Sequence, residues 1–119
     1  MRVPEEFDQF CSRFVEWQVV MDCYGGSLET LIEEVVLDLN EHQRLVVRQF
    51  LDKLLSGRYS SADLVGIWRR TSAGMNLGNA KQTVARLRYM HDLLADPARM
   101  RALEAKLFRD RHRPSPTEG

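Results

Sequence analysis

The sequence predicts an all-α protein, a compact bundle of five to six short amphipathic helices. Apolar residues recur at spacings of three and four along most of the chain, which is the period of a helix. Residues that favour helix caps interrupt this pattern. No segment of useful length alternates apolar and polar residues, so we expect no strands. A chain of 119 residues suits one domain, which we place at residues 1–110, followed by a disordered tail at 111–119.

The first two predicted helices begin near Pro4 and Ser27. Proline suits the first position of a helix, and the acidic residues that follow Pro4 complement the helix dipole. The apolar stripe of this helix comprises Phe7, Phe10, Cys11, Phe14, Trp17 and Met21. The glycine pair at positions 25 and 26 ends the helix, and Ser27 is placed to cap the next one. The stripe of that second helix comprises Leu28, Leu31, Ile32, Val35, Val36 and Leu39.

Cap residues also define the third and fourth helices. Asn40, followed by Gln43, matches a capping box and opens the third helix. Its stripe comprises Val46, Val47, Phe50, Leu51, Leu54 and Leu55. Gly57 occupies the position of a left-handed C-cap. Ser60, with Asp63 three residues later, starts a shorter fourth helix whose inward residues are Leu64, Ile67 and Trp68.

The last two predicted helices follow a loop at residues 71–78, which two glycines interrupt. Asn79 is placed to cap the fifth helix. We expect its inward residues to be Val84, Leu87, Met90, His91 and Leu94. Asp96 and Pro97 form an N-cap with a first-position proline and open the sixth helix. The stripe of the sixth helix comprises Met100, Leu103 and Leu107.

The two cysteines indicate a reducing compartment. Cys11 and Cys23 lie twelve residues apart in the first predicted helix, which is about 18 Å at 1.5 Å per residue. A disulfide requires the two Cα atoms to lie within about 7 Å, so we expect reduced thiols, with Cys11 as a small core residue. No run approaches the roughly 20 apolar residues of a membrane span, and early acidic residues interrupt any secretory signal. We therefore expect a cytoplasmic protein.

The net charge of zero conceals an asymmetry along the chain. Residues 1–43 contain ten acidic and two basic residues, a net charge of −8. Residues 44–119 contain seven acidic and fifteen basic residues, a net charge of +8. The two halves can neutralise each other through internal salt bridges between helix faces, or the acidic half can meet a basic partner. The same split also suits self-association, in which the acidic half of one chain meets the basic half of another.

The residue pattern predicts neither a metal site nor a catalytic site. The three histidines are scattered, at positions 42, 91 and 112, and the cysteines lack the spacing of a zinc site. We interpret His91 as a histidine satisfied at the edge of the core. Glu29, Glu33 and Glu34 could form paired acids, but we expect them to be exposed, opposite the apolar stripe of their helix. We therefore expect no enzyme and no cofactor.

Basic residues of the C-terminal half favour a second function class, nucleic-acid binding. They lie in the last three predicted helices and the tail: Arg69, Arg70, Lys81, Arg86, Arg88, Arg99, Arg101, Lys106, Arg109, Arg111 and Arg113. In a helix-turn-helix interpretation, the fifth helix presents Asn79, Lys81 and Gln82 to the bases. The preceding loop of about eight residues is longer than the three or four that this motif uses. A helical nucleic-acid-binding regulator is therefore the alternative interpretation.

Four segments of the chain form a further pattern: Phe14-Val-Glu-Trp17, Ser27-Leu-Glu-Thr-Leu-Ile-Glu-Glu34, the amphipathic segment from Val46 to Ser56, and the junction Leu54-Leu-Ser-Gly-Arg-Tyr-Ser-Ser-Ala-Asp-Leu64 leading to Ile67-Trp68. Through these segments, residues 14–94 resemble the immunity proteins of bacterial contact-dependent growth-inhibition systems. The family's aromatic–His–Gln–Asp–aromatic motif is one residue shorter here and lacks the histidine and the aspartate. The resemblance covers about two-thirds of the chain.

This resemblance implies a small helical protein that binds and neutralises a cognate protein toxin, often a nuclease, and needs no cofactor. Nuclease active sites are basic because they bind phosphate, so an acidic inhibitor face gains steered association. We expect that face to comprise Asp8, Glu16, Asp22, Glu29, Glu33 and Glu34, with Tyr24 and Tyr59 as aromatic anchors. The alternatives are the nucleic-acid-binding regulator and a homo-oligomeric adaptor.

Overall fold

The computed structural model describes the backbone of residues 2–24 and 27–111 and the side chains of residues 2–18 and 27–107. The described chain forms six helices and no strand, which confirms the all-α fold. The helices are α1 (Glu5–Tyr24), α2 (Leu28–Leu37), α3 (Glu41–Leu54), α4 (Ser61–Arg69), α5 (Ala80–Ala95) and α6 (Pro97–Arg111). Arg111, predicted to begin the tail, is the last residue of α6, and residues 112–119 lie outside the described residues.

The predicted caps form as hydrogen-bonded structures. The hydroxyl of Ser27 accepts from the backbone N–H of Thr30 at 3.2 Å. Capping boxes open three helices, formed by Asn40 with Gln43, Ser60 with Asp63, and Asn79 with Gln82. The carboxylate of Asp96 accepts from the backbone N–H groups of Ala98 and Arg99 at 3.1 and 3.2 Å. Gly57 has φ +95°, the left-handed conformation expected after α3.

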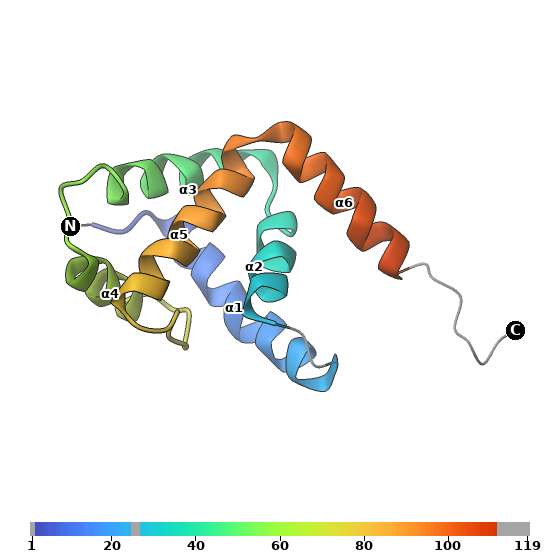
Figure 1. The fold of residues 1–119 in the computed structure, drawn as a ribbon, viewed down its shortest axis with the longest axis horizontal. Coiled ribbons are helices and arrows are strands. Elements are labelled where there is room, and N and C mark those ends of the chain that lie inside the picture. Colours follow the sequence, from blue (N-terminus) through green and yellow to red (C-terminus); the bar gives the residue numbers. More distant parts are fainter. Residues whose placement is uncertain (1, 25–26, 112–119) are drawn as a thin grey trace, which may run out of the picture.

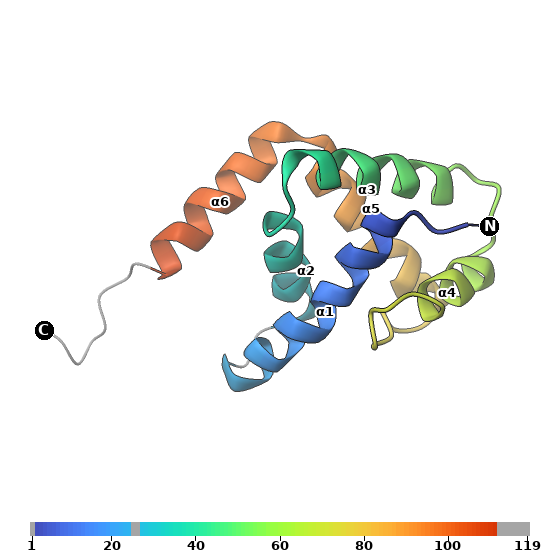
Figure 2. The ribbon, with the colours of Figure 1, turned by 180° about the vertical axis from the view of Figure 1, so that it is seen from behind.

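Helix α5 is the element that the other helices share. It packs against α2, α3, α4 and α6, while α1 packs against α2 and α3 (Figure 1). The view from behind shows α1 crossing the other side of the bundle (Figure 2). Helix α6 projects from the end of α5 on the side away from α4. Its residues Met100, Leu103 and Leu107 are buried, and Arg44 of α3 reaches Glu104 at 3.5 Å.

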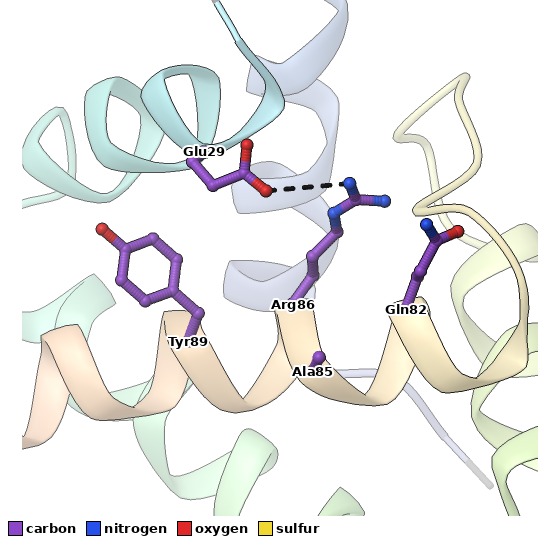
Figure 3. A pocket seen from close by; sticks show the side chains of 5 residues that line it. All are labelled: Glu29, Gln82, Ala85, Arg86 and Tyr89. Atoms are coloured by element: carbon purple, nitrogen blue, oxygen red, sulfur yellow. Dashed lines mark ion pairs between the residues drawn. The ribbon is translucent and has the colours of Figure 1, made fainter.

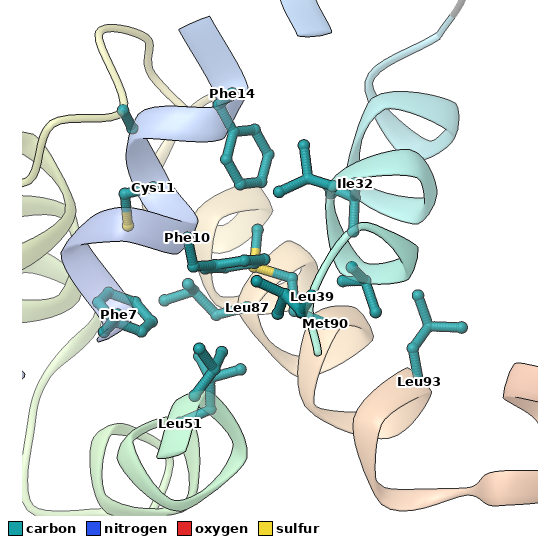
Figure 4. Packing of buried hydrophobic residues seen from close by; sticks show 14 of the residues in the cluster. Phe7, Phe10, Cys11, Phe14, Ile32, Leu39, Leu51, Leu87, Met90 and Leu93 are labelled. Atoms are coloured by element: carbon teal, nitrogen blue, oxygen red, sulfur yellow. The ribbon is translucent and has the colours of Figure 1, made fainter. Parts of the chain in front are cut away.

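The core is built around the aromatic stripe of α1 (Figure 4). Phe7, Phe10 and Phe14 are fully buried. The ring of Phe7 meets that of Phe50 edge-on, with centroids 4.6 Å apart, and Phe14 meets Trp68 in the same way at 5.3 Å. These contacts bring α1, α3 and α4 together around one set of rings.

Cys11 is fully buried within this core, as predicted. Burial raises the pKa of the Cys11 thiol to about 12, because the charged thiolate loses its hydration. Cys23 lies with it on the single helix α1, but the side chain of Cys23 lies outside the described residues. The helix is continuous between Cys11 and Cys23, and the predicted distance between their Cα atoms depends on this continuity.

The loop between α4 and α5 contributes to the core, which was not predicted. Ala73 and Leu77 are each 1% exposed. The indole N–H of Trp68 donates to the carbonyl of Met75 at 2.9 Å. On α1, Asp8 accepts hydrogen bonds from Ser72, one from its backbone N–H at 3.0 Å and one from its hydroxyl at 2.9 Å. The loop is therefore held to both α4 and α1.

Helix α5 buries a slightly different set of residues from the predicted one. Leu87, Met90 and Leu93 are buried, whereas Val84 and Leu94 are only partly buried. Thr83 is buried instead, and its hydroxyl donates to the carbonyl of Asn79 at 2.9 Å, so its polar group is satisfied. In the part of the chain that the structure describes, no helix combines the length and the apolar character that crossing a bilayer requires.

Candidate functional site

Helix α2 carries acidic residues on two opposite sides. Successive residues of a helix turn by about 100°, so Glu29 and Glu33 share one side, and Glu34 shares the other with Asp38, the residue that follows the helix as its C-cap. The first side faces α5, where both carboxylates meet polar groups. The second side faces α1, where Asp38 pairs with Arg13. The acidic residues of α2 are therefore not one surface.

A cleft of about 330 Å³ lies between α2 and α5, and we call it the α2–α5 cleft. It is lined by Glu29 of α2 and by Gln82, Ala85, Arg86 and Tyr89 of α5 (Figure 3). Figure 3 shows the side chains of Gln82, Arg86 and Tyr89 rising from α5 on the side that faces α2. Clefts of this size with a few convergent polar groups are the usual form of a ligand site.

Arg86 lies between Tyr89 and Gln82 along α5, and two contacts hold it in place (Figure 3). Its Nη1 donates to the carbonyl oxygen of Leu77 at 2.5 Å. Its Nη2 lies 3.7 Å from the Oε1 atom of Glu29, a long ion pair. The Arg86 side chain is 23% exposed, whereas that of Glu29 is 56% exposed. The guanidinium of Arg86 therefore binds mainly groups of the protein itself, while the carboxylate of Glu29 faces solvent.

Gly78 makes room for this arrangement. It has φ +98°, a backbone conformation that residues with a side chain rarely adopt. A Cβ atom at this position would lie 2.8 Å from Nη1 of Arg86 and 2.3 Å from Oε1 of Gln82. The Gln82 oxygen accepts from the backbone N–H of Asn79 at 2.9 Å, as part of the capping box of α5. Glycine at this position therefore lets the cap and Arg86 coexist.

Tyr89 lines the cleft on the side of Arg86 away from Gln82 (Figure 3). Its hydroxyl donates to Oε2 of Glu33 at 2.5 Å, and the guanidinium carbon of Arg99 lies 5.4 Å from its ring centroid. Burial, with the hydrogen bond to Glu33 and the charge of that carboxylate, raises the pKa of Tyr89 to about 12. Glu33 lies on α2 and Tyr89 on α5, so this hydrogen bond joins two helices whose residues are 56 positions apart in the sequence.

The opposite side of α2 forms a smaller polar pocket with α1. Its volume is about 90 Å³, and it is lined by Trp17, Glu34, Leu37 and Asp38. A guanidinium nitrogen of Arg13 donates to the carboxylate of Asp38 and, at 3.0 Å, to its carbonyl oxygen. Glu34 is 7% exposed, so the prediction of an exposed Glu34 is wrong. It follows Leu31 by three positions and so falls beside the buried stripe of the helix.

The structure places the other predicted interface residues in several regions. Asp8 binds Ser72 of the α4–α5 loop, and Glu16 is exposed on α1. Tyr59 is half-buried in the turn between α3 and α4, and Figure 1 shows this turn on the side of the bundle away from α2. Asp22 and Tyr24 belong to the last part of α1, and their side chains lie outside the described residues. The predicted set therefore does not form one face, and its role in partner binding stays a prediction.

Comparison with known proteins adds no relative. No family model, no curated protein and no solved structure matches this chain. The chemistry of the α2–α5 cleft therefore rests on its own side chains, which offer carboxylate oxygens, one guanidinium and an aromatic ring.

Two further clusters were considered for chemistry. His91 is half-buried, and its Nε2 pairs with the carboxylate of Asp52 on α3, as predicted for a satisfied histidine at the core edge. Its Nδ1 lies 3.4 Å from the carboxylate of the neighbouring Asp92. Among the described residues, no group of three or more histidine, cysteine or acidic side chains is placed to hold a metal ion.

Sequence reasoning assigned Gln82 and Arg86 to a nucleic-acid-binding surface and did not single out Tyr89, so it missed the cleft that these residues line. Gln82, Arg86 and Tyr89 recur at spacings of four and three, the same period that marks an apolar stripe. This second stripe is polar, so a search for apolar periodicity passes over it. Its match with Glu29 and Glu33 depends on how α2 and α5 pack, which local sequence does not determine.

Proposed function

We propose that this protein neutralises a cognate protein toxin by binding it without catalysis, through exposed carboxylates in the acidic N-terminal part of the chain. The sequence resemblance to immunity proteins of contact-dependent growth-inhibition systems supports this proposal. So does the junction from Leu54 to Leu64, on which that resemblance depends most. It joins α3 to α4 through Gly57 in a left-handed conformation and a capping box at Ser60.

The exposed negative charge of the first three helices carries the proposal. Glu16, Glu29, Asp38 and Glu41 are all exposed. Glu29 and Asp38 have arginine partners, Arg86 and Arg13, and even these two carboxylates are 56% and 44% exposed. Negative charge in solvent raises the rate of association with a basic surface, such as the phosphate-binding site of a nuclease.

The proposal predicts that a gene adjacent to this one encodes a toxin domain, and the test is whether this protein protects bacterial growth against that domain. Co-expression with that domain is expected to restore bacterial growth, and the purified proteins are expected to form a stable complex. The informative variant is Glu16→Lys with Glu41→Lys, because neither carboxylate has a partner among the described residues and the fold should survive. The association rate is expected to fall roughly tenfold at low salt and less at high salt.

A control separates local from overall charge. Asp92→Lys places the charge change of one reversal on α5, in the basic half of the chain, where Asp92 is 51% exposed. It is therefore compared with Glu16→Lys and with Glu41→Lys, each made singly. Equal loss for Asp92→Lys and Glu16→Lys, or growth inhibition that co-expression never relieves, contradicts the proposal.

The same protein tests the two alternatives. Exposed basic residues of α5 and α6 suit the nucleic-acid-binding regulator: Lys81, Arg88, Arg99, Arg101 and Lys106. That function predicts binding to duplex DNA with a steep dependence on salt. A homo-oligomeric adaptor predicts a molar mass that rises with concentration and falls with salt.

A further inference from the structure

We propose that the α2–α5 cleft binds the basic side chain of a partner protein, a guanidinium or ammonium group carried on an aliphatic stem. The inference deepens the proposed function and rests on it, because the side chain would belong to the neutralised toxin domain. Three observations carry it: the exposed carboxylate in the cleft, the apolar side chains that line the cleft, and the hydrogen bonds that hold its polar side chains in place.

The accessible charge of the cleft is negative. The Glu29 side chain is 56% exposed, whereas that of Arg86 is 23% exposed. Arg86 already donates to the carbonyl of Leu77. A carboxylate offers about four acceptor positions, and the 3.7 Å contact with Arg86 occupies Glu29 only weakly. An incoming cation therefore finds free acceptors, and an incoming anion meets an exposed carboxylate.

The wall of the cleft suits an aliphatic stem. Ala85 and the ring of Tyr89 line it beside Glu29 (Figure 3). Lysine and arginine side chains commonly lay their methylene groups on such apolar surface while the charged end stays polar. The same ring already receives the guanidinium of Arg99, 5.4 Å from its centroid. This cation occupies one face of the ring, so we expect the aliphatic stem to lie on the remaining apolar surface of Tyr89 and Ala85.

The polar groups around the cleft are held before any ligand arrives. Tyr89 is bonded to Glu33, Arg86 to Leu77, and Gln82 to the backbone of Asn79. A cation can approach Glu29 without rearranging these three bonds. Sites that are already ordered lose less entropy on binding, which favours recognition of even a single side chain.

The first experiment titrates the full-length ¹⁵N-labelled protein with three small molecules of similar shape. The probes are n-butylguanidinium, its neutral counterpart n-butylurea, and the anion pentanoate, at low salt. We expect n-butylguanidinium to shift amide signals of α2 and α5 around the cleft, with a millimolar Kd. Glu29→Gln is expected to weaken this binding roughly two- to fivefold, whereas the matched variant Asp92→Asn, on α5, leaves it unchanged.

Three results overturn the inference. They are equal binding of n-butylurea, equal or tighter binding of pentanoate, and shifts by n-butylguanidinium that Glu29→Gln does not weaken. Because Glu29 is exposed, its substitution should not unfold the protein, and the thermal unfolding curve of Glu29→Gln checks this.

A second measurement separates this inference from the proposed function. Glu29→Gln is expected to weaken binding of the toxin domain, while Asp92→Asn is not. If the toxin domain is neutralised equally well by Glu29→Gln, the cleft inference is wrong and the proposed function stands. If n-butylguanidinium binds through Glu29 but no adjacent toxin domain is neutralised, the proposed function is wrong and the cleft remains a cation site.

Discussion

The hydrogen bonds between Asp8 and Ser72 are expected to contribute measurably to stability. Asp8 lies in the first turn of α1, and its carboxylate accepts both bonds at 3.0 and 2.9 Å. Bonds to a charged group contribute about 1.5–3 kcal/mol when shielded and less when solvent competes. We therefore expect Asp8→Ala to lower the free energy of unfolding by about 2 kcal/mol, which is about 8 °C in Tm for a domain of this size.

The assay is urea and thermal unfolding of a double-mutant cycle. Ser72→Ala removes the hydroxyl but keeps the backbone N–H, so the coupling energy between Asp8→Ala and Ser72→Ala should be about 1 kcal/mol. Glu5→Ala is the matched control, because Glu5 is another acidic residue of the same helix turn and is exposed. It should lose the dipole contribution, about 0.5 kcal/mol, together with a long, exposed hydrogen bond of 3.4 Å from the amide of Gln9.

The reasoning fails if the coupling energy is below about 0.3 kcal/mol, within which independent sites add. It also fails if Glu5→Ala costs as much as Asp8→Ala, because the loss would then come from the helix dipole alone. If Asp8→Asn weakened binding of a toxin domain without lowering stability, Asp8 would act in partner binding, as predicted from the sequence.

Three further predictions concern glycine, cysteine and tyrosine positions. Gly78→Ala should destabilise the protein by about 1–2 kcal/mol because its φ is +98° and its Cβ meets Arg86, whereas Gly66→Ala, in α4 with nothing near its Cβ, should stabilise it by about 0.5–1 kcal/mol in chemical unfolding. With its pKa near 12, Cys11 should escape alkylation by iodoacetamide at pH 8 in the native protein and react in urea, as peptide mass mapping can determine; equal labelling in both states would contradict its burial. Folding raises the pKa of Tyr89 from 10 to about 12, so between pH 10 and 12 the native state keeps a proton that the unfolded state has lost. The free energy of unfolding should therefore fall as pH rises from 10 to 12. Unfolding curves of Tyr89→Phe should show a smaller fall, and an identical fall would refute the assignment.

Much of the fold could be predicted because it depends on local chemistry. The caps at Ser27, Asn40 and Ser60 bind backbone groups three residues away, so a short sequence pattern suffices to find them. The rings of α1 are likewise found from their spacing, as Phe7 and Phe14 show. Both kinds of signal are contained within a few turns of helix.

The rest depends on which segments meet, and local patterns do not contain that information. Leu77 is buried although its loop has no periodicity. Glu34 is buried although its charge suggested solvent. Glu29 was assigned to a docking face, but its relation to Arg86 follows from the packing of α2 on α5. For this reason the acidic residues were predicted as one surface and occur in separate regions.

The two occupied sides of α2 limit how the protein can change in evolution. Five of the ten residues of this helix are buried, and Glu29 alone is exposed. A saturation scan scored for folding should accept most side chains at position 29 and few at the five buried positions. Variation between lineages that leaves the fold intact would therefore be greatest at one codon of this helix. That codon encodes the residue whose carboxylate opens into the α2–α5 cleft.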